Sequence, residues 1–251
     1  MSGYDRALTV FSPDGHLFQV EYACEAVKKG TTTLGIRAKN CIILAVENKA
    51  MSTLQADHAV KKISQIDEHI YLTFAGLLAD ARVLVDTARL ECQNHRLTYD
   101  EAPSVASVTD YIARTQQKHT QRGGMRPFGV STILAACDPD KSLRLFLTEP
   151  GGVTTEWYAC VIGRGEAVVR KYLENHYHAD MDEESAIDLA IRALLEVLEP
   201  NKKFFDIFVL PKDVGRAHFL SEEILEERIR VADAARTAKE KEAKLSGNNT
   251  V

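Results

Sequence analysis

The order of the secondary-structure signals is the feature that most constrains the fold of this chain. One amphipathic helix comes first, and groups of short β-branched runs then alternate with pairs of amphipathic helices. Strands that follow one another without an intervening helix favour antiparallel sheets over βαβ units. Two stacked sheets with helix pairs on their outer faces would bury every apolar stripe. The order therefore predicts an α+β fold, and periodicity alone leaves the stacking open.

The expected elements follow from apolar spacing and from the turn residues between them. Residues 12–15 read Ser-Pro-Asp-Gly, which is typical of a type I turn, and Gly30 suits the end of the helix that follows. The expected helices cover about residues 17–29, 78–96, 104–121, 165–177 and 183–198, with a charged helix from 221. The expected strands cover residues 32–37, 41–47, 62–66, 70–75, 129–137, 143–148, 153–159, 205–210 and 217–220.

The composition argues against nucleic-acid, membrane and metal chemistry. A formal net charge of −5 provides no basic field for nucleic acid, and the longest purely apolar run, residues 41–46, is far shorter than a membrane span. The first fifteen residues are polar and acidic where a signal peptide needs an apolar stretch, so we expect a retained, cytosolic chain. The five cysteines are scattered without a CxxC pair, which favours buried thiols in a reducing compartment.

The segment from residue 4 to residue 30 closely resembles the signature of proteasome alpha subunits. It reads YDR at 4–6, TVFSPDGHLFQVEYA at 9–23 and EAVKKG at 25–30. Further matching segments are FAGL at 74–77, ADAR at 79–82, RPFG at 126–129 and IGRG at 162–165. The resemblance covers about residues 4–230 and is strongest to the type at the fourth position of the eukaryotic alpha ring. It implies a four-layer αββα sandwich, the fold of N-terminal nucleophile hydrolases, with two antiparallel sheets flanked by helices.

The same resemblance implies a non-catalytic subunit of the 20S proteasome core particle, without a cofactor, in the cytoplasm and nucleus. Its expected partners are other alpha subunits in a seven-membered ring, beta-ring subunits, and regulatory particles or activators that dock through their carboxyl-terminal tails. Its expected work is ring assembly, gating of the substrate pore and activator docking in ATP- and ubiquitin-dependent protein degradation. The implied organisation is a gate segment at 1–16, the alpha-type domain at 17–230 and a charged, partly disordered tail at 231–251.

One group of residues matches the cluster that holds the open gate in alpha subunits: Tyr4, Asp5, Pro13 and Tyr22. Two phenol hydroxyls and a carboxylate can hydrogen-bond to one another, and a charged acceptor strengthens such bonds. Pro13 restricts the turn that sets where the segment points. The alternative for Tyr22 is an ordinary helix residue that packs on a strand.

A second group matches the pocket that receives activator tails: Lys62, Leu17, Gly30 and Gly76. A flexible ammonium such as that of Lys62 suits a terminal carboxylate as a point charge. The family's pocket lies between neighbouring subunits, so one chain supplies only part of it. The alternative for Lys62 is a solvated lysine at the end of a strand.

A competing hypothesis begins at Thr31. The run GTTTLG at 30–35 resembles the processing site of catalytic beta subunits, where cleavage frees an amino-terminal threonine whose own amine serves as base. Glu47 and Lys62 lie near the positions where beta subunits keep a carboxylate and a lysine. However, a peptide nitrogen cannot act as a base, because its lone pair is delocalised into the carbonyl. Arg164 also replaces a serine of the beta subunits, so we favour a strand start over a threonine protease.

Overall fold

The computed structural model describes residues 10–48, 61–198 and 205–247, with side chains described as far as residue 237. It contains two five-stranded sheets in which all neighbouring strands are antiparallel, with the orders β10-β9-β2-β1-β8 and β3-β4-β5-β6-β7. The strands are β1 (Thr33–Arg37), β2 (Cys41–Glu47), β3 (Ile63–Asp67), β4 (Ile70–Gly76), β5 (Val130–Cys137), β6 (Leu143–Thr148), β7 (Thr154–Glu156), β8 (Ala159–Ile162), β9 (Phe205–Pro211) and β10 (His218–Phe219).

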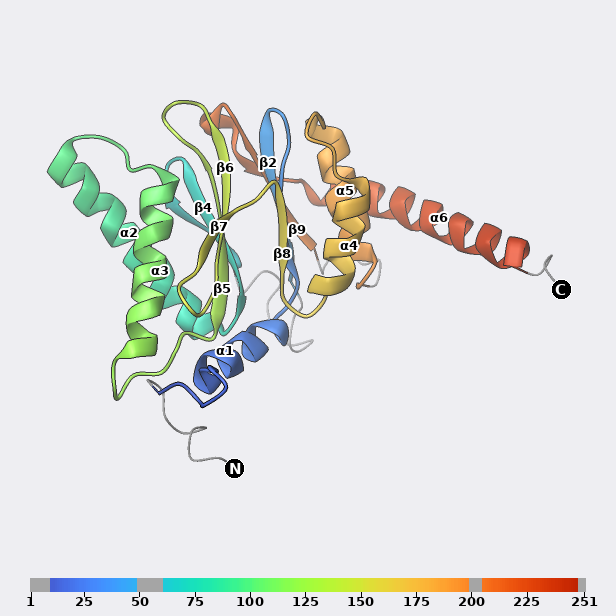
Figure 1. Cartoon of the computed structure of the whole chain (residues 1–251). Coiled ribbons are helices and arrows are strands. Elements are labelled where there is room, and N and C mark those ends of the chain that lie inside the picture. Colours follow the sequence, from blue (N-terminus) through green and yellow to red (C-terminus); the bar gives the residue numbers. More distant parts are fainter. Residues whose placement is uncertain (1–9, 49–60, 199–204, 248–251) are drawn as a thin grey trace, which may run out of the picture.

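Helices cover both outer faces of the sheet pair (Figure 1). The helices are α1 (Phe18–Lys28), α2 (Leu78–Tyr99), α3 (Val105–Gln121), α4 (Glu166–His176), α5 (Glu183–Leu195) and α6 (Glu222–Gly247), with a short 3-10 helix η3 (Val214–Arg216). Helices α2 and α3 lie on the side of β3–β7, α4 and α5 lie on the opposite side, and α1 lies across one end of the sandwich. This arrangement confirms the four-layer αββα fold.

Three apolar cores hold the four layers together, and β2 shows why its sequence suits the middle of the molecule. Ile43 and Ala45 belong to the core between the first sheet and α4, α5 and α6. Ile42 and Leu44 belong to the core between the two sheets. Alternate residues of a strand point to opposite faces, so a continuous apolar run fits a strand that is buried on both sides. The third core lies between the second sheet and the helices α2 and α3.

Local signals in the sequence account for several element boundaries. The backbone N–H of Gly15 donates to the carbonyl of Ser12 at 2.9 Å, which confirms the predicted turn before α1. The hydroxyl of Ser104 accepts the backbone N–H of Ser107 at 3.3 Å and caps the start of α3. Pro103 directly precedes the capping residue. The carboxylate of Asp182 caps α5 in the same way, at 3.0 Å from the N–H of Ser185.

The structure differs from the expectation at three boundaries. The strand predicted at 153–159 is two strands in different sheets, because β7 pairs with β6 whereas β8 pairs with β1. Gly30 is expected as the carboxyl cap of the first helix, whereas Lys29 is the cap residue and Gly30 follows it directly, without a positive φ. The predicted boundary at 230–231 falls inside α6, where Ala232 is still buried.

The outermost strands of both sheets are short or irregular. In the second sheet, β7 has three residues and β3 has a register shift between Gln65 and Asp67. In the first sheet, β10 has two residues and β8 has four.

Candidate functional site

The antiparallel register brings the predicted site residues to one end of the sandwich. Thr33, the first residue of β1, lies opposite Val46 of β2 and Ile162 of β8. Glu47 is the last residue of β2 and Arg164 lies two residues after the end of β8, so both lie beside the start of β1. The hydroxyl of Thr33 donates to the carbonyl oxygen of Phe74 in β4 at 3.2 Å, which links the two sheets at the same end.

The carboxylate of Glu47 is bound on both oxygens. Its side chain is 1% exposed, and Oε2 accepts the backbone N–H of Thr32 at 3.0 Å. Oε1 forms an ion pair with the guanidinium of Arg164. The backbone N–H of Arg164 in turn donates to the carbonyl oxygen of Gly30 at 3.0 Å. Glu47 and Arg164 therefore hold the backbone on both sides of Thr31.

Lys62 lies next to this ion pair but outside it. Its ammonium is 6.0 Å from the centroid of the Phe74 ring, and within the described segments it makes no ion pair. Burial lowers the pKa of Lys62 to about 8; Glu47 and Asp206 act in the opposite direction, and Arg164 adds to the lowering. At neutral pH the side chain is still mostly charged, so this end of the sandwich holds a half-buried cation without a direct counter-ion in those segments.

Thr31 is an internal residue of a packed chain. Helix α1 precedes it, buries Ala23 and Val27, and packs against β4 and β5. Gly30 joins the helix to the strand, and its N–H donates to the carbonyl of Val27 at 2.8 Å. The nitrogen of Thr31 is an amide in this arrangement and has no basic lone pair.

The two predicted pocket glycines, Gly30 and Gly76, touch each other through their backbones. A Cβ atom on Gly30 would lie 2.4 Å from the backbone nitrogen of Gly76. Gly76 has a φ of 119°, and a Cβ there would lie 2.1 Å from the carbonyl oxygen of Gly129. Only residues without a side chain allow these three segments to meet. This backbone contact explains why glycine occupies position 30, for which the sequence suggested a helix cap.

Leu17, the fourth predicted pocket residue, lies at the opposite end of α1 from Gly30. Helix α1 has eleven residues. At 1.5 Å per residue it is about 16 Å long. The chain thus brings Gly30, Gly76 and Lys62 to one end and leaves its own Leu17 at the other.

Two of the four predicted gate residues, Tyr4 and Asp5, lie outside the described residues. Pro13 is exposed in the turn before α1, and Tyr22 is 50% exposed on α1. The Tyr22 ring stacks on that of Phe18 with centroids 6.4 Å apart. The gate assignment stays a prediction.

A second ion pair supports the same end of the sandwich, and sequence reasoning missed it. Both oxygens of the buried Asp80 accept from the guanidinium of Arg126 at 2.6 Å, and one also accepts the N–H of Gly129 at 2.9 Å. Arg126 lowers the pKa of Asp80 most, with a further contribution from the Gly129 N–H. The loop residue Arg126 therefore binds its own chain. The sequence feature that could have indicated this ion pair is an aspartate within the otherwise apolar first turn of α2.

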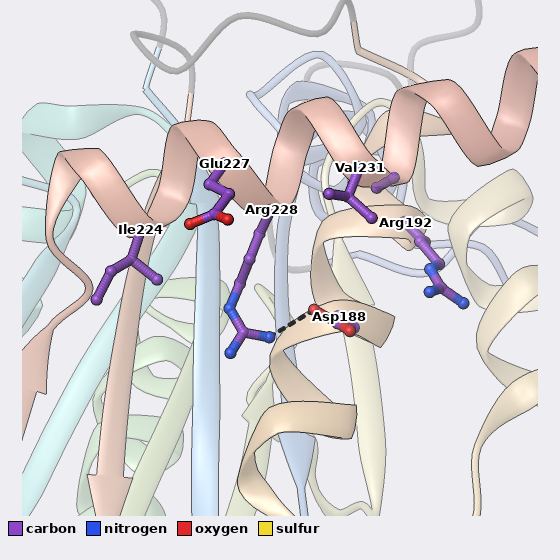
Figure 2. A pocket seen from close by; sticks show the side chains of 7 residues that line it. Asp188, Arg192, Ile224, Glu227, Arg228 and Val231 are labelled. Atoms are coloured by element: carbon purple, nitrogen blue, oxygen red, sulfur yellow. Dashed lines mark hydrogen bonds and ion pairs between the residues drawn. The ribbon is translucent and has the colours of Figure 1, made fainter.

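The groove between α5 and α6 has a volume of about 300 Å³ and none of the predicted site residues. Asp188 and Arg228 form an ion pair of 2.7 Å across it, as Figure 2 shows. Within the described part of the chain, no helix is long and apolar enough to cross a membrane, and no cluster of three His, Cys, Asp or Glu side chains could hold a metal ion. All five cysteines are free; four are buried and Cys24 is partly exposed.

Comparison with known proteins agrees with this geometry. The family described as the N-terminal signature of proteasome A subunits matches residues 4–26, and the family described as Proteasome subunit matches residues 27–209. The alpha type-7 proteasome subunit of Caenorhabditis elegans is 47% identical over 98% of this chain and 99% of its own length. The alpha type-8 proteasome subunit of Mus musculus is 45% identical over 99% of each chain. The alpha type-4 proteasome subunit of Saccharomyces cerevisiae is 47% identical over 89% of this chain and 90% of its own. The chain therefore belongs to the proteasome subunit family, as a subunit of the alpha type.

Proposed function

We propose that this alpha-ring subunit of the 20S core particle has no proteolytic activity of its own and that beta-ring subunits cleave the substrates. The observation that carries the proposal is the packing of residues 18–30 in front of Thr31. Helix α1 buries Ala23 and Val27 against the sheet, and Gly30 lies against Gly76. Exposing an amine at Thr31 would therefore require removal of a structural helix.

The surroundings of Thr31 give a second reason. Arg164 and the Thr32 N–H already occupy both oxygens of Glu47. A nucleophilic threonine needs a nearby group to remove its proton. Here the buried carboxylate is committed to holding the backbone, so it is poorly placed for that task.

Exposed apolar residues on α2 support contacts with other subunits in the particle. Val83, Leu90 and Leu97 recur at seven-residue spacing and are 53%, 61% and 86% exposed. Residues seven apart lie on one side of a helix, so the three side chains form a stripe. We propose that another subunit covers this stripe in the assembled particle, for which the resemblance implies a ring of seven alpha subunits beside the beta-ring subunits.

The cation at Lys62 supports activator docking. An incoming carboxyl-terminal tail would place its carboxylate against this ammonium, next to Gly30 and Gly76. The distance along α1 argues that the Leu17 side of the pocket comes from a neighbouring subunit. The proposed pocket therefore forms only in the ring.

The remaining expectations are proposals from the resemblance. They are a pore gate built with Tyr4, Asp5, Pro13 and Tyr22, the fourth ring position, residence in the cytoplasm and nucleus, and a role in ATP- and ubiquitin-dependent degradation. The exposed positions of Pro13 and Tyr22 support the gate, because both side chains are accessible to a neighbouring segment.

The intact mass of the mature protein tests the absence of catalysis. We expect a species that includes residues 1–30 and does not react with an electrophilic proteasome inhibitor. A species that begins at Thr31 and becomes labelled at that threonine would establish the self-processing protease instead.

Charge reversal at Lys62 tests the docking site. Lys62→Glu should weaken docking of activator tails while the ring still assembles, because it places a carboxylate against a carboxylate. Lys61→Glu is the matched control, since Lys61 is the adjacent lysine but is exposed. Equal activator binding by both variants would remove the pocket assignment.

A further inference from the structure

We propose that Arg164 is a positioning residue that keeps Lys62 available for a ligand carboxylate by occupying Glu47 in its place. The inference rests on the proposed docking function and adds a residue that controls it. It concerns three charged side chains that come from distant parts of the sequence, at positions 47, 62 and 164.

The first step is that the buried carboxylate of Glu47 requires a positively charged partner. Its side chain is 1% exposed, and the Thr32 N–H satisfies only one of its two oxygens. A buried carboxylate without a positive partner destabilises the fold, because no ion pair compensates for its lost hydration. Arg164 meets this demand from the surface, with a side chain that is 48% exposed. A guanidinium stays charged at all relevant pH values, and its planar set of donors suits a carboxylate.

The second step is the competition for that carboxylate. Lys62 is close enough for Glu47 and Arg164 to act on its charge in opposite directions. Its four-carbon stem is flexible, and an ammonium can turn toward any nearby acceptor. If Arg164 were absent, Lys62 would be the nearby cation left to pair with Glu47 among the residues that the structure describes. A tail carboxylate would then have to compete with an internal carboxylate for the same ammonium.

The third step is the local charge balance. The charged groups that act on Lys62 are Glu47, Arg164 and Asp206. Asp206 accepts a hydrogen bond from the Asn48 side chain at 2.7 Å, so it is held toward β2. Among the described residues that act on Lys62, Arg164 is the other cation. Its loss removes one positive charge beside Lys62 and makes the site less favourable for a carboxylate ligand.

The first measurement follows the amine itself in the full-length protein. The rate of acylation of Lys62, read by mass spectrometry across pH 6–10, reports the fraction of neutral amine. Arg164→Met should shift this profile to higher pH and slow acylation at pH 8 by roughly tenfold, which corresponds to a pKa rise of somewhat more than one. Arg164→Lys, which keeps the charge, should stay close to the parent. Arg170→Met is the control, because Arg170 pairs with Glu166 on the exposed face of α4.

A double variant separates positioning from a merely structural role. In Arg164→Met/Glu47→Gln the amide can still accept the Thr32 N–H, but the competing charge is gone. The acylation profile should return to that of the parent or move to lower pH. A profile that Arg164→Met does not change, or a shift that the added Glu47→Gln does not reverse, would overturn the inference.

The second measurement follows docking in the assembled particle. The probe is a short photo-crosslinking peptide with a free carboxyl terminus, compared with the same peptide as a carboxyl-terminal amide, and the readout is labelling of this chain. Arg164→Met should reduce carboxylate-dependent labelling by roughly tenfold, and the double variant should restore it. If Lys62→Glu leaves labelling unchanged, the docking function fails, whatever the acylation shows. If Lys62→Glu abolishes labelling but Arg164→Met changes neither readout, only the present inference fails.

Discussion

Alanine substitutions at three glycines should separate backbone strain from steric overlap at the candidate site. Gly15 has a φ of 81°, but a Cβ there would have no neighbour within 4 Å. Gly30 has no positive φ, but its Cβ would lie 2.4 Å from the backbone nitrogen of Gly76. Gly76 combines both problems, with a φ of 119° and a Cβ 2.1 Å from the Gly129 carbonyl oxygen. The three positions therefore form a graded series.

The magnitudes follow from these two contributions. A left-handed conformation costs an alanine about 1–2 kcal/mol, which is the whole expected effect at Gly15. Overlap with rigid backbone costs about 3 kcal/mol, at the upper end of the range for overpacked cores, which is the expected effect at Gly30. The sum for Gly76 is about 5 kcal/mol, comparable with the entire stability of many domains. Gly76→Ala should therefore fold poorly, if at all, whereas Gly30→Ala should fold with reduced stability.

Urea unfolding of the purified full-length proteins, followed by circular dichroism, measures these differences. Thermal unfolding should show the same order, with a lowering of Tm of roughly 2–4 °C for each kcal/mol in a chain of this size. The reasoning would be refuted if Gly30→Ala were as stable as the parent, or if Gly15→Ala were the more damaging of the two. Either result would mean that the contact between Gly30 and Gly76 does not limit what fits there.

Two further predictions concern the supports around the site. Asp80→Asn should destabilise the protein by about 1–2 kcal/mol at pH 7, with the exposure of Arg126 keeping the effect modest. Arg126 holds the pKa of Asp80 below its ordinary value, so this contribution to stability is present above the ordinary pKa and is lost as pH falls through the lowered pKa. Urea unfolding at pH 7 and in acid should show the stability difference between the parent and Asp80→Asn disappearing in acid. Asp110→Asn, which alters an exposed ion pair, should change nothing at either pH. Ser104→Ala should lower stability by about 1 kcal/mol through loss of the helix cap, and Ser104→Asp should preserve it. An unchanged urea midpoint for Ser104→Ala would show that the cap is dispensable.

Local signals in the sequence predicted most of the fold, since apolar spacing and turn residues depend on near neighbours. The predicted limits of β2 and β6 coincide with the observed ones, and the turn at 12–15 has its expected hydrogen bond. The prediction of a single strand at 153–159 was wrong because tertiary pairing, not local sequence, divides this segment. Residues 157 and 158 carry the chain from one sheet to the other, and a short β-branched run does not reveal which partner each half will meet.

The candidate site was less accessible to sequence reasoning because its contacts join distant segments. Arg164 stands out in the sequence as a replacement for a serine, but its pairing with Glu47 spans 117 residues and depends on the register of three strands. Arg126 and Asp80 are 46 residues apart, and no local pattern connects them. The sequence favours a conformational role for Gly30 because glycine often ends helices, whereas its observed role is to allow another backbone to approach.

The brevity of the outer strands has a consequence for how this protein can associate. A long, regular sheet margin offers unpaired amides to any similar chain, so that subunits held at high local concentration could fuse into continuous sheets. Here β7 and β10 span only three and two residues, and β3 is interrupted by its irregularity. Recognition between subunits must then rely on the shapes and charges of side chains, which differ from one paralogue to another. Main-chain hydrogen bonds, which are the same in every protein, contribute little to that choice.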